Sequence, residues 1–459
     1  MTTYKNINVF NRTPENYNSR GYPNGSNQEL FVDTIIELEE NREDIEKVHL
    51  ALYLFNNKNL YRSLSECARS GARVTVTSLP LSGYDSRKIS EAQELYAKIV
   101  EDTEISLKIF PHMYSWYGAR YAGGGASYSF HIKTGLIEYK NGSQKVFVSS
   151  GNYAPGDPTH SETAIFIKSV DNSKILKPFS KFFNEVEKRA LDFKEYHDQT
   201  SNLEPIYQRL VDFSFIGGSK QVNFSDGFPS NFVFSAPFIK MNGLGSNHYA
   251  RERIIELISN ARHRLLLCAQ HSHDIKPFDG YIGPTIIGTL IEKKRANPDI
   301  DVRVLKQVSS SGLADKRRAA FVEGHLHYSS IPQKVNRLVH DKFIVADDVV
   351  LITSANFTAT QFGWGDRRME FRTQTGDIKK VEKIIELGNN LFDNDSNQIW
   401  TFMSRPRSGS PIVRVLKNDV FSEVNAFIII ENKAIANTLA NYYRKLWSHN
   451  HSSNVEIPI

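Results

Sequence analysis

The feature that most constrains the fold of this 459-residue chain is an internal repeat offset by roughly 220 residues. The sequence Gly25-Ser26-Asn27 returns as Gly245-Ser246-Asn247, and a matching apolar helical segment follows each copy. A strand-like, a helix-like and a second strand-like segment then come in the same order in both copies. A duplication of this length predicts two lobes of one fold rather than an array of short repeats. We therefore predict a pseudo-twofold pair of lobes that share one active-site cleft.

The order of these segments predicts the class of each lobe. In the first copy, residues 47–55 have the pattern of a buried strand, 59–71 that of a helix and 72–79 that of another strand. The second copy repeats this order at 264–270, 284–297 and 301–308. Alternating strands and helices favour a largely parallel sheet with helices on both faces. The predicted fold class is α/β, with two α/β/α lobes.

Changes in composition predict where the lobes begin and end. The first residues are polar and rich in Asn, Pro and Gly, which predicts an irregular arm, and a helix is expected to begin at Ser26. The segment between the lobes is too apolar for a free spacer, so an ordered linker packed on both lobes is expected. The full prediction is an arm (1–24), a first lobe (25–199), a linker (200–244) and a second lobe (245–459) with an insertion at about 362–415.

The second copy carries a compact group of polar residues in the stretch VHDKFIVADDVVLITSAN. His340, Lys342 and Asp347 stand in an H-x-K-x4-D spacing, and Ser354 and Asn356 follow. Side chains alternate along a strand, so His340 and Lys342 share one face. Two short strands that meet at Asp347 would return Ser354 and Asn356 to that face. An imidazole, an ammonium group, a hydroxyl and a carboxamide in one place suit the cleavage of a phosphate ester.

The first copy carries the same group, with His131 and Lys133 followed by Ser150 and Asn152. A single H-x-K is not specific, and a lone histidine on a strand is more often structural. Two copies, each ending in S-x-N, indicate a shared chemistry. The pair resembles the HKD motifs of the phospholipase D superfamily, and the motifs with their surrounding repeat cover most of the chain.

The resemblance implies a two-step, metal-independent cleavage of a phosphodiester that needs no cofactor. One histidine attacks phosphorus to give a phosphohistidine, and the other protonates the leaving oxygen and then activates water or another alcohol. The family suggests His131 as the nucleophile and His340 as the general acid, although the sequence leaves their order open. Lysines and asparagines would hold the phosphoryl oxygens, and one glutamate would orient each histidine. The predicted catalytic set is His131, Lys133, Asn152, Glu162, His340, Lys342, Asn356 and Glu423, with Glu138, Ser150, Asp347 and Ser354 as supporting residues.

The second orienting glutamate is chosen by context. The segment that starts SEVNAF near the end of the chain repeats the shape of SETAIF in the first lobe, which places Glu423 opposite Glu162. Glu370, in RRMEFR, is a rival for this role.

The motifs also depart from the family pattern. The first has Glu138 where the family usually has Asp, and it is longer between His and Asn than the second, 21 residues against 16. The second has Thr353 in place of the usual Gly. Members of the tyrosyl-DNA phosphodiesterase branch of the family lack this acid, and they also have a lengthened first hairpin. An active enzyme and a chain with one weakened half both stay open.

Residues outside the motifs are candidates for substrate contacts. Aromatic residues before His131 could stack bases or pack the lobe interface, and basic residues in the insertion could form a lid or a solvated surface. These candidates are Tyr114, Trp116 and Tyr117, and Arg367 and Arg368. The run His271-Ser272-His273-Asp274 could ligate a metal, but it lacks a third clear partner, so we prefer a cleft lining or a turn.

Charge and cysteine content restrict partners and compartment. The net charge of +5 and the clusters at 293–295 and 316–318 permit a polyanionic partner, although such clusters also form solvated faces. The chain starts without a signal-sequence pattern and has no apolar run of membrane-span length, so a cytoplasmic protein is expected. Cys67 and Cys268 lie in apolar segments and are expected in the core.

Three functions are compatible with these observations. The favoured one is a nuclease acting on DNA or RNA. The alternative is a phospholipid-processing hydrolase or phosphatidyltransferase, although relatives of that kind usually carry a signal sequence or membrane spans. A non-catalytic nucleic-acid-binding protein is the third, and the intact His and Lys in both motifs argue against it. The sequence does not predict the oligomeric state.

Overall fold

A computed structural model describes large parts of both predicted lobes. The described residues are 6–12, 32–53, 55, 57–78, 94–99, 101, 104–110, 130–152, 160–169, 176–200, 222–225, 232–236, 238–275, 283–308, 313–362, 367–372, 399–404, 412–417 and 423–455. The expected helix start at Ser26 lies outside these ranges, and the first helix, α1, covers Val32–Glu40.

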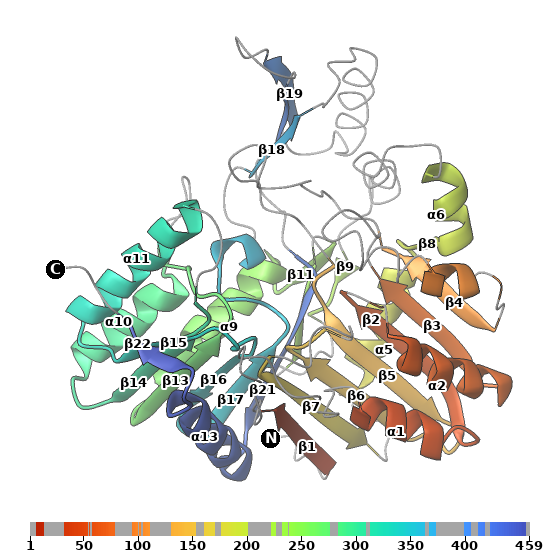
Figure 1. Ribbon diagram of the computed structural model, residues 1–459, viewed down its shortest axis with the longest axis horizontal. Helices are drawn as coiled ribbons and strands as arrows, with labels where there is room; N and C mark the ends of the chain where they lie inside the picture. Colours follow the sequence, from red (N-terminus) through yellow and green to blue (C-terminus); the bar gives the residue numbers. More distant parts are fainter. Residues whose placement is uncertain are drawn as a thin grey trace.

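The first lobe is built on an eight-stranded sheet with the spatial order β1-β7-β6-β5-β2-β3-β4-β8 (Figure 1). The hairpin of the first motif is formed by β5 (Lys133–Tyr139) and β6 (Gln144–Ser149). The other strands are β1 (Asn6–Arg12), β2 (Ile45–Leu52), β3 (Arg73–Ser78), β4 (Ile105–Ile109), β7 (Glu162–Ser169) and β8 (Leu191–Asp192).

The second lobe repeats this sheet in the order β10-β21-β17-β16-β13-β14-β15-β22. Its motif hairpin consists of β16 (Lys342–Ala346) and β17 (Val349–Thr353). The other strands are β10 (Phe232–Ser235), β13 (Arg264–Ala269), β14 (Asp301–Lys306), β15 (Gln333–Asn336), β21 (Asn425–Glu431) and β22 (Ser452–Asn454). The two strand orders correspond position by position, so the predicted duplication is confirmed in the sheet topology.

The expectation of a largely parallel sheet is wrong. In the first sheet only the β2–β3 and β3–β4 pairs are parallel, and in the second only β13–β14 and β14–β15. The motif hairpins occupy the middle of each sheet and pair antiparallel with both neighbours. An apolar run indicates a covered strand, but it does not give the direction of that strand.

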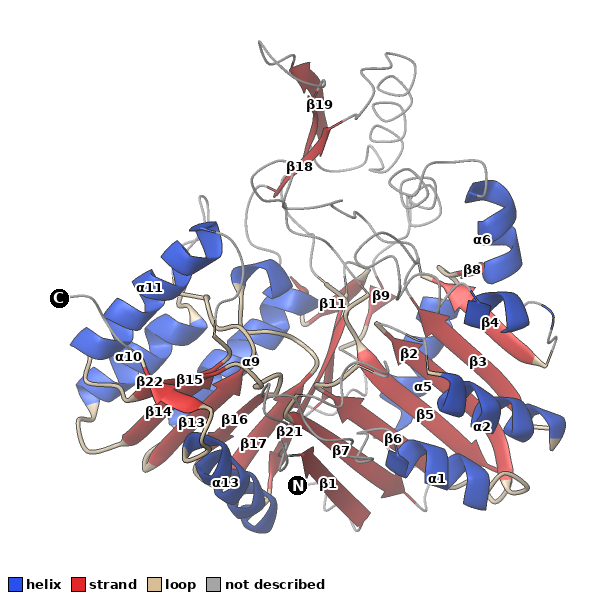
Figure 2. Ribbon diagram, in the orientation of Figure 1, coloured by secondary structure: helices blue, strands red, loops and turns tan. Residues whose placement is uncertain are grey.

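Helices cover both faces of each sheet (Figure 2). In the first lobe α1 and α2 (Lys58–Arg69) lie in front in this view and α5 (Leu176–Glu187) lies behind, while α6 (Phe193–Thr200) follows β8. In the second lobe α13 (Lys433–Trp447) lies on one side, and α9 (Ser246–Asn260), α10 (Ile286–Ala296) and α11 (Leu313–Tyr328) form the layer on the other. The predicted α/β/α layering is confirmed.

Local sequence explains where several helices begin. Asn57 caps α2 by accepting the N–H of Leu60 at 2.9 Å, and Thr285 caps α10 by accepting that of Gly288 at 3.2 Å. Each side chain satisfies a backbone donor that has no partner within the helix.

The two lobes share an apolar core. Buried side chains of β6 and β7 belong to the same cluster as those of β16, β17 and β21, so the two sheets meet along the motif strands. A second cluster fills the space between the first sheet and its helices α1 and α2. Cys67 and Cys268 are fully buried and form no disulfide, as predicted. Burial of a continuous apolar surface across the seam fixes the position of each motif relative to the other.

Two segments expected outside the sheets supply edge strands. Within the expected irregular arm, β1 pairs antiparallel with β7, and within the expected linker, β10 pairs antiparallel with β21. These strands occupy equivalent places in the two sheets, so both are part of the duplicated unit. The segment that contains β10 also packs on the first lobe, because the rings of Phe234 and Phe182 stack with their centres 4.1 Å apart.

Two smaller sheets complete the described part of the chain. One contains β9 (Val222–Asn223), β11 (Ile239–Met241) and β12 (Leu244–Gly245). The predicted insertion contributes the other, from β18 (Arg367–Arg372), β19 (Ile399–Ser404) and β20 (Ile412–Lys417). None of the helices in the described ranges has the length and apolar content that crossing a bilayer requires.

Candidate active site

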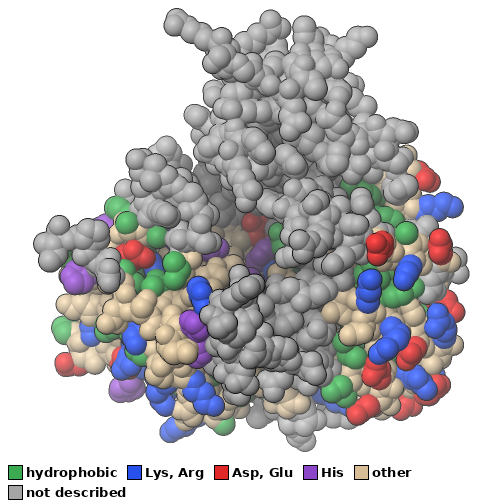
Figure 3. All heavy atoms as spheres, viewed as in Figure 1, with side chains coloured by type: hydrophobic (Ala, Val, Ile, Leu, Met, Phe, Trp, Pro, Cys, Tyr) green, Lys and Arg blue, Asp and Glu red, His purple; other side chains and the backbone are tan. Residues whose placement is uncertain are grey.

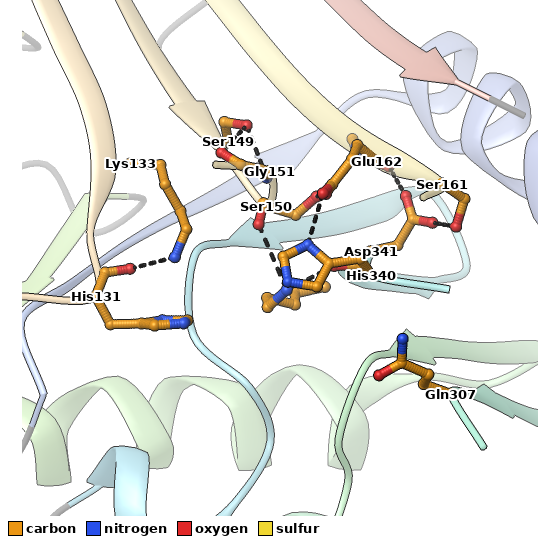
Figure 4. A network of polar contacts seen from close by, with 12 residues as sticks. His131, Lys133, Ser149, Ser150, Gly151, Ser161, Glu162, Gln307, His340 and Asp341 are labelled. Carbon is orange, nitrogen blue, oxygen red and sulfur yellow. Dashed lines mark hydrogen bonds and ion pairs between the residues drawn. The ribbon is translucent and has the colours of Figure 1, made fainter. Parts of the chain in front are cut away.

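The two motif hairpins bring their polar residues to the seam between the lobes. His131 and His340 each stand just before the first strand of a hairpin, and Lys133 and Lys342 are the first residues of those strands. Figure 4 shows His131 and His340 entering the site from opposite sides. Histidine side chains are visible in the hollow between the two halves of the face in Figure 3. The hairpin arrangement predicted from the spacing is confirmed.

His340 is held by a carboxylate from the other lobe. Its Nδ1 lies 2.6 Å from Oε1 of Glu162, which is fully buried at the start of β7. Ser150 donates to the second oxygen of Glu162 at 2.6 Å (Figure 4). Because Nδ1 is engaged, Nε2 of His340 is the nitrogen that can exchange a proton with a substrate.

His131 is held by an amide from the other lobe. Its Nδ1 lies 3.3 Å from Oδ1 of Asn425, and the Glu423 carboxylate is farther away at 3.9 Å. Gln361 ties this group together, because it donates to Glu423 and accepts from Asn425 at 3.0 Å. Ser354 donates to Asn425 at 3.0 Å, as Ser150 does to Glu162.

The predicted equivalence of Glu423 and Glu162 is wrong. Ser149 pairs with Ala164 in the first lobe, and Thr353 pairs with Phe427 in the second, so the counterpart of Glu162 is Asn425. Glu423 stands two residues earlier. The similar segments SETAIF and SEVNAF suggested the wrong register. When the two sheets are aligned by their strand pairing, the Ser-Glu pair of the second segment lies two residues before the position that corresponds to the Ser-Glu pair of the first.

Both lysines are fully buried beside the histidines. Lys133 donates to the His131 carbonyl at 2.7 Å and lies 4.9 Å from the ring centre of Tyr53. Lys342 donates to the His340 carbonyl at 2.5 Å and, across the seam, to the Ser150 carbonyl at 3.4 Å. Two ammonium groups at one buried place form a strong site for an anion.

The two asparagines of the S-x-N endings have the same unsatisfied atom. Oδ1 of Asn152 and Oδ1 of Asn356 are buried and have no hydrogen-bond partner among the described residues. A buried polar atom without a partner is costly, and it is commonly found where a ligand binds. Since the two ends of a carboxamide can exchange places, either asparagine could present its N–H groups to a phosphoryl oxygen.

The electrostatics of the site favour neutral imidazoles. Burial lowers the pKa of His131 well below its ordinary value, and the charges of Lys133 and Lys342 lower it further. Burial also lowers the pKa of His340, with Lys342 again adding to the shift. The Glu162 carboxylate opposes this shift at His340, and His131 has no carboxylate so close.

The acids of the two motifs stand at the other end of the hairpins. Asp347 adopts φ 51° in the turn and accepts the backbone N–H groups of Arg262, His263 and Arg264 at 2.7–2.9 Å. A strand of this length places it roughly 20 Å from His340. Glu138 accepts from Gln144 at 3.3 Å and lies 3.9 Å from Lys47. Both acids hold the hairpins, and neither contacts a motif histidine or lysine.

The Asp347→Ala variant is therefore expected to lose stability and keep its chemistry. Three backbone donors lose a charged acceptor, which lowers the free energy of unfolding by about 2 kcal/mol. Urea unfolding measures this loss, and Glu138→Ala serves as the control with a smaller change. A fall in turnover per folded molecule would contradict this structural role.

The stability that Asp347 contributes depends on pH. Burial raises the pKa of Asp347, but three backbone N–H groups lower it more, so its pKa is below the ordinary value. The stabilisation by Asp347 is therefore fully present above about pH 4, the pKa of an aspartate in the unfolded chain. It is lost as the pH falls from there through the lower pKa of Asp347 in the folded protein.

Other predicted residues lie elsewhere or outside the described ranges. Tyr114, Trp116 and Tyr117 are outside them, and Arg367 and Arg368 lie on β18, where only the backbone is described. Within the 293–295 cluster, Lys293 donates to the Ser259 carbonyl in the last turn of α9, and Lys294 donates to the Pro298 and Ile300 carbonyls after α10, so both lysines hold local structure. In the run 271–274, both Asp274 oxygens bind the Arg251 side chain, at 3.0 and 3.3 Å, which favours the predicted turn over a metal site.

Several residues at the site were missed by sequence reasoning. His160 packs against His340 with ring centres 5.7 Å apart, and Tyr53 packs against His131 at 5.0 Å. Asn425 and Gln361 complete the surroundings of His131. Asn425 could have been found by aligning the strands on Ala164 and Phe427 rather than on the Ser-Glu pairs. The others carry no spacing signal.

No protein-family model and no curated protein matches the chain. Among solved structures it is similar to polyphosphate kinase from Porphyromonas gingivalis, at 11% identity over 96% of this chain, with a TM-score of 0.45. It spans 50% of that kinase's length. It is similar to Nuc from Salmonella typhimurium, a phospholipase D family member, at 14% identity over 49% of this chain and 96% of Nuc (TM-score 0.27). Phosphatidylserine synthase from Haemophilus influenzae matches at 12% identity over 93% of this chain and 85% of its own (TM-score 0.46).

Proposed function

We propose that this chain is a phosphodiesterase that works through a phosphohistidine and does not require a metal. The observation that carries this proposal is the crossed pair of contacts, in which His131 and His340 of opposite lobes are each held at Nδ1 by a residue of the other lobe. Both Nε2 atoms are then available to one substrate, and two buried lysines stand beside them. This arrangement supplies a nucleophile, a proton donor and charge stabilisation in one site.

The different partners of the histidines support His131 as the nucleophile. A neutral amide at Nδ1 leaves a neutral imidazole with a lone pair on Nε2, whereas the carboxylate of Glu162 stabilises a charged imidazole at His340. A bound phosphodiester brings a negative charge beside Lys133 and Lys342. It therefore offsets the effect of both lysines, and His340 takes up a proton as substrate binds.

The proposed reaction has two balanced steps. In the first, Nε2 of His131 bonds to phosphorus, the bond from phosphorus to the leaving oxygen breaks, and that oxygen takes the proton from Nε2 of His340. In the second, His340 removes a proton from water, the water oxygen bonds to phosphorus, and the bond to His131 breaks. The products are a phosphomonoester and an alcohol. Lys133, Lys342, Asn152 and Asn356 bind the non-bridging oxygens in both steps.

For the substrate we propose a nucleic acid strand in a cytoplasmic setting. Support comes from the aromatic residues that precede His131 in sequence, Tyr114, Trp116 and Tyr117, and from the overall positive charge. The lysines of the 293–295 cluster give no support, because they bind backbone carbonyls.

A cleavage assay in EDTA tests both parts of the proposal. Labelled single-stranded and double-stranded DNA, RNA and phospholipid vesicles are offered to the wild type and to His340→Ala. His449→Ala, which changes a histidine after α13, is the matched control. We expect nucleic acid cleavage that resists EDTA, is lost in His340→Ala and is kept in His449→Ala. Release of a lipid head group with intact nucleic acid would keep the mechanism and replace the substrate. Activity that needs a divalent cation would overturn the mechanism.

A further inference from the structure

The residue between His340 and Lys342 is the centre of a buried polar cluster that joins the lobes. Asp341 is fully buried. Its carboxylate accepts hydrogen bonds from Ser161 and from Thr163, the latter at 2.5 Å, and both donors belong to the first lobe. Tyr442 of α13 donates to the same carboxylate, with oxygen distances of 3.1 and 3.2 Å. We call Asp341, Ser161, Thr163 and Tyr442 the seam cluster.

The seam cluster lies directly behind the pair of His340 and Glu162. Glu162 and Thr163 are the first residues of β7, Ser161 directly precedes them, and His340 precedes Asp341. The backbone is tied at the same place, because His340 N donates to the Ser161 carbonyl at 3.2 Å and Ser161 N donates to the Leu338 carbonyl at 2.7 Å. Figure 4 shows Asp341 and Ser161 on the far side of Glu162 from the site. Any shift of β7 against residues 338–341 would therefore change the contact between Glu162 and His340.

The equivalent place in the other half is apolar. Strand register and motif position match Asp341 with Ile132, Ser161 with Val424 and Thr163 with Ala426. All three counterparts are buried hydrocarbon side chains. An apolar contact is therefore sufficient to hold the fold at this position, and a charged cluster occurs only behind the histidine that has a carboxylate partner.

We propose that Asp341 is a positioning residue, which holds Glu162 against His340 by gathering three hydroxyl donors from both lobes around one ionised carboxylate. The ionised form accepts from all three hydroxyls. A protonated carboxyl must itself donate, so one contact of the cluster is lost or reversed. The positioning is complete only while Asp341 is charged. This inference rests on the proposed function for its kinetic consequences.

The surroundings place the titration of Asp341 in an accessible range. Burial raises the pKa of Asp341 to about 6, against the hydroxyl donors that lower it. The titratable groups that face it are Glu162 on β7, Tyr442 on α13 and Cys268 on β13, and its neighbours His340 and Lys342 flank it. Turnover should therefore fall as the pH drops through about 6.

The kinetic test uses steady-state turnover of bis(p-nitrophenyl) phosphate between pH 5 and 8, because the second step needs His340 whatever the leaving group. Tyr442→Phe removes one donor to the Asp341 carboxylate, which raises the pKa of that carboxylate. The fall in kcat on the acid side of the pH profile, which we call the acid limb, should therefore move to higher pH. Asp341→Asn should lower kcat at least tenfold with little change in KM, and its acid limb should be absent. Thr163→Ser keeps the hydroxyl donor, so its kcat and pH profile should match those of the wild type. Thr163→Val removes the donor, so its kcat and pH profile should differ from those of the wild type.

Tyr443→Phe is the matched control. It is the same substitution one residue further along α13, but the Tyr443 hydroxyl has no hydrogen-bond partner among the described residues. The proposal predicts a shifted limb for Tyr442→Phe and an unchanged limb for Tyr443→Phe. Coincident profiles for the two variants and the wild type would overturn it.

A second measurement does not depend on activity. The folded protein binds the Asp341 proton more tightly than the unfolded chain, so the wild type should lose stability relative to Asp341→Asn as the pH rises from about 4 to 6. In the same samples, NMR follows the strongly deshielded N–H proton of His340 that Glu162 holds. This signal should weaken in Asp341→Asn. An unchanged NMR signal together with parallel stability curves would contradict the inference, even if bis(p-nitrophenyl) phosphate is not hydrolysed. If the only negative result is that this substrate is not hydrolysed, that result would count against the proposed function and not against the positioning role of Asp341.

Discussion

The His340→Ala variant is expected to stop halfway through the reaction and to leave phosphorus attached to His131. With bis(p-nitrophenyl) phosphate the first leaving group is p-nitrophenolate, which departs without a proton. The first step then proceeds without His340, and the second step lacks its base. We expect one equivalent of p-nitrophenolate per site, and steady-state turnover should fall by about 1000-fold or more. On a diester with an alkoxide leaving group, both steps should be slow.

His131→Ala is the comparison that makes this result informative. It removes the nucleophile, so neither a burst nor an adduct is expected, and the loss of turnover should be at least as large. Mass spectrometry of the acid-sensitive adduct, followed by peptide mapping, identifies the histidine that carries phosphorus. An adduct on His340 in His131→Ala would reverse the order of the two residues. No adduct in any variant, with turnover retained, would exclude a covalent route.

Glu162→Gln is expected to cause the second largest loss, because it changes one atom at the 2.6 Å contact with His340. The amide cannot stabilise the charged imidazole and can turn its N–H towards Nδ1, which favours the wrong tautomer. We expect kcat to fall by about 100-fold or more, with a smaller change in KM. Thermal unfolding controls for lost packing, since Glu and Gln have nearly the same volume. Wild-type kcat in this variant would show that the contact is only structural.

Asn425→Asp is the reverse substitution at the other histidine, because it adds a carboxylate beside His131 where Glu162→Gln removes one beside His340. It places a carboxylate at the position that now lies 3.3 Å from Nδ1 of His131. An adjacent opposite charge raises the pKa of a histidine. His131 would then be protonated, and lack its lone pair, below that higher pKa. Activity of the variant should be close to wild type at pH 8 and fall more steeply towards pH 6. A profile that matches the wild type would contradict the role given to the amide.

The sequence predicted those parts of the site that depend on short spacing. The H-x-K and S-x-N elements lie at the same end of one hairpin, where its first strand begins and its second strand ends, so local geometry was enough to group His340, Lys342 and Asn356. The repeat of that hairpin was enough to predict two lobes. These inferences use neighbours in the chain, where strand geometry leaves little freedom.

The parts that failed depend on pairing between distant strands. The partner of His131 lies 294 residues away, and the Ser-Glu pairs at 161 and 422 suggested a register that the hydrogen bonds do not follow. Residues 6–12 alternate polar and apolar side chains only over the short stretch from Asn6 to Val9, and they form β1 by pairing with the edge of β7. The importance of Asp341 was not visible either, since its partners Ser161 and Thr163 are about 180 residues away and carry no motif.

The crossed contacts also bear on how such a chain could have arisen. A protein in which each half completes the other half's site is what fusion of two identical subunits would produce, because a symmetric dimer already places a residue of one subunit against the histidine of its partner. In such a dimer every substitution occurs twice, and both histidines must have the same neighbours. A single gene that encodes both halves removes this restriction. The carboxylate at 162 and the amide at 425 are a difference that a dimer of identical subunits cannot hold, and fusion thereby allows the two histidines to specialise in different steps.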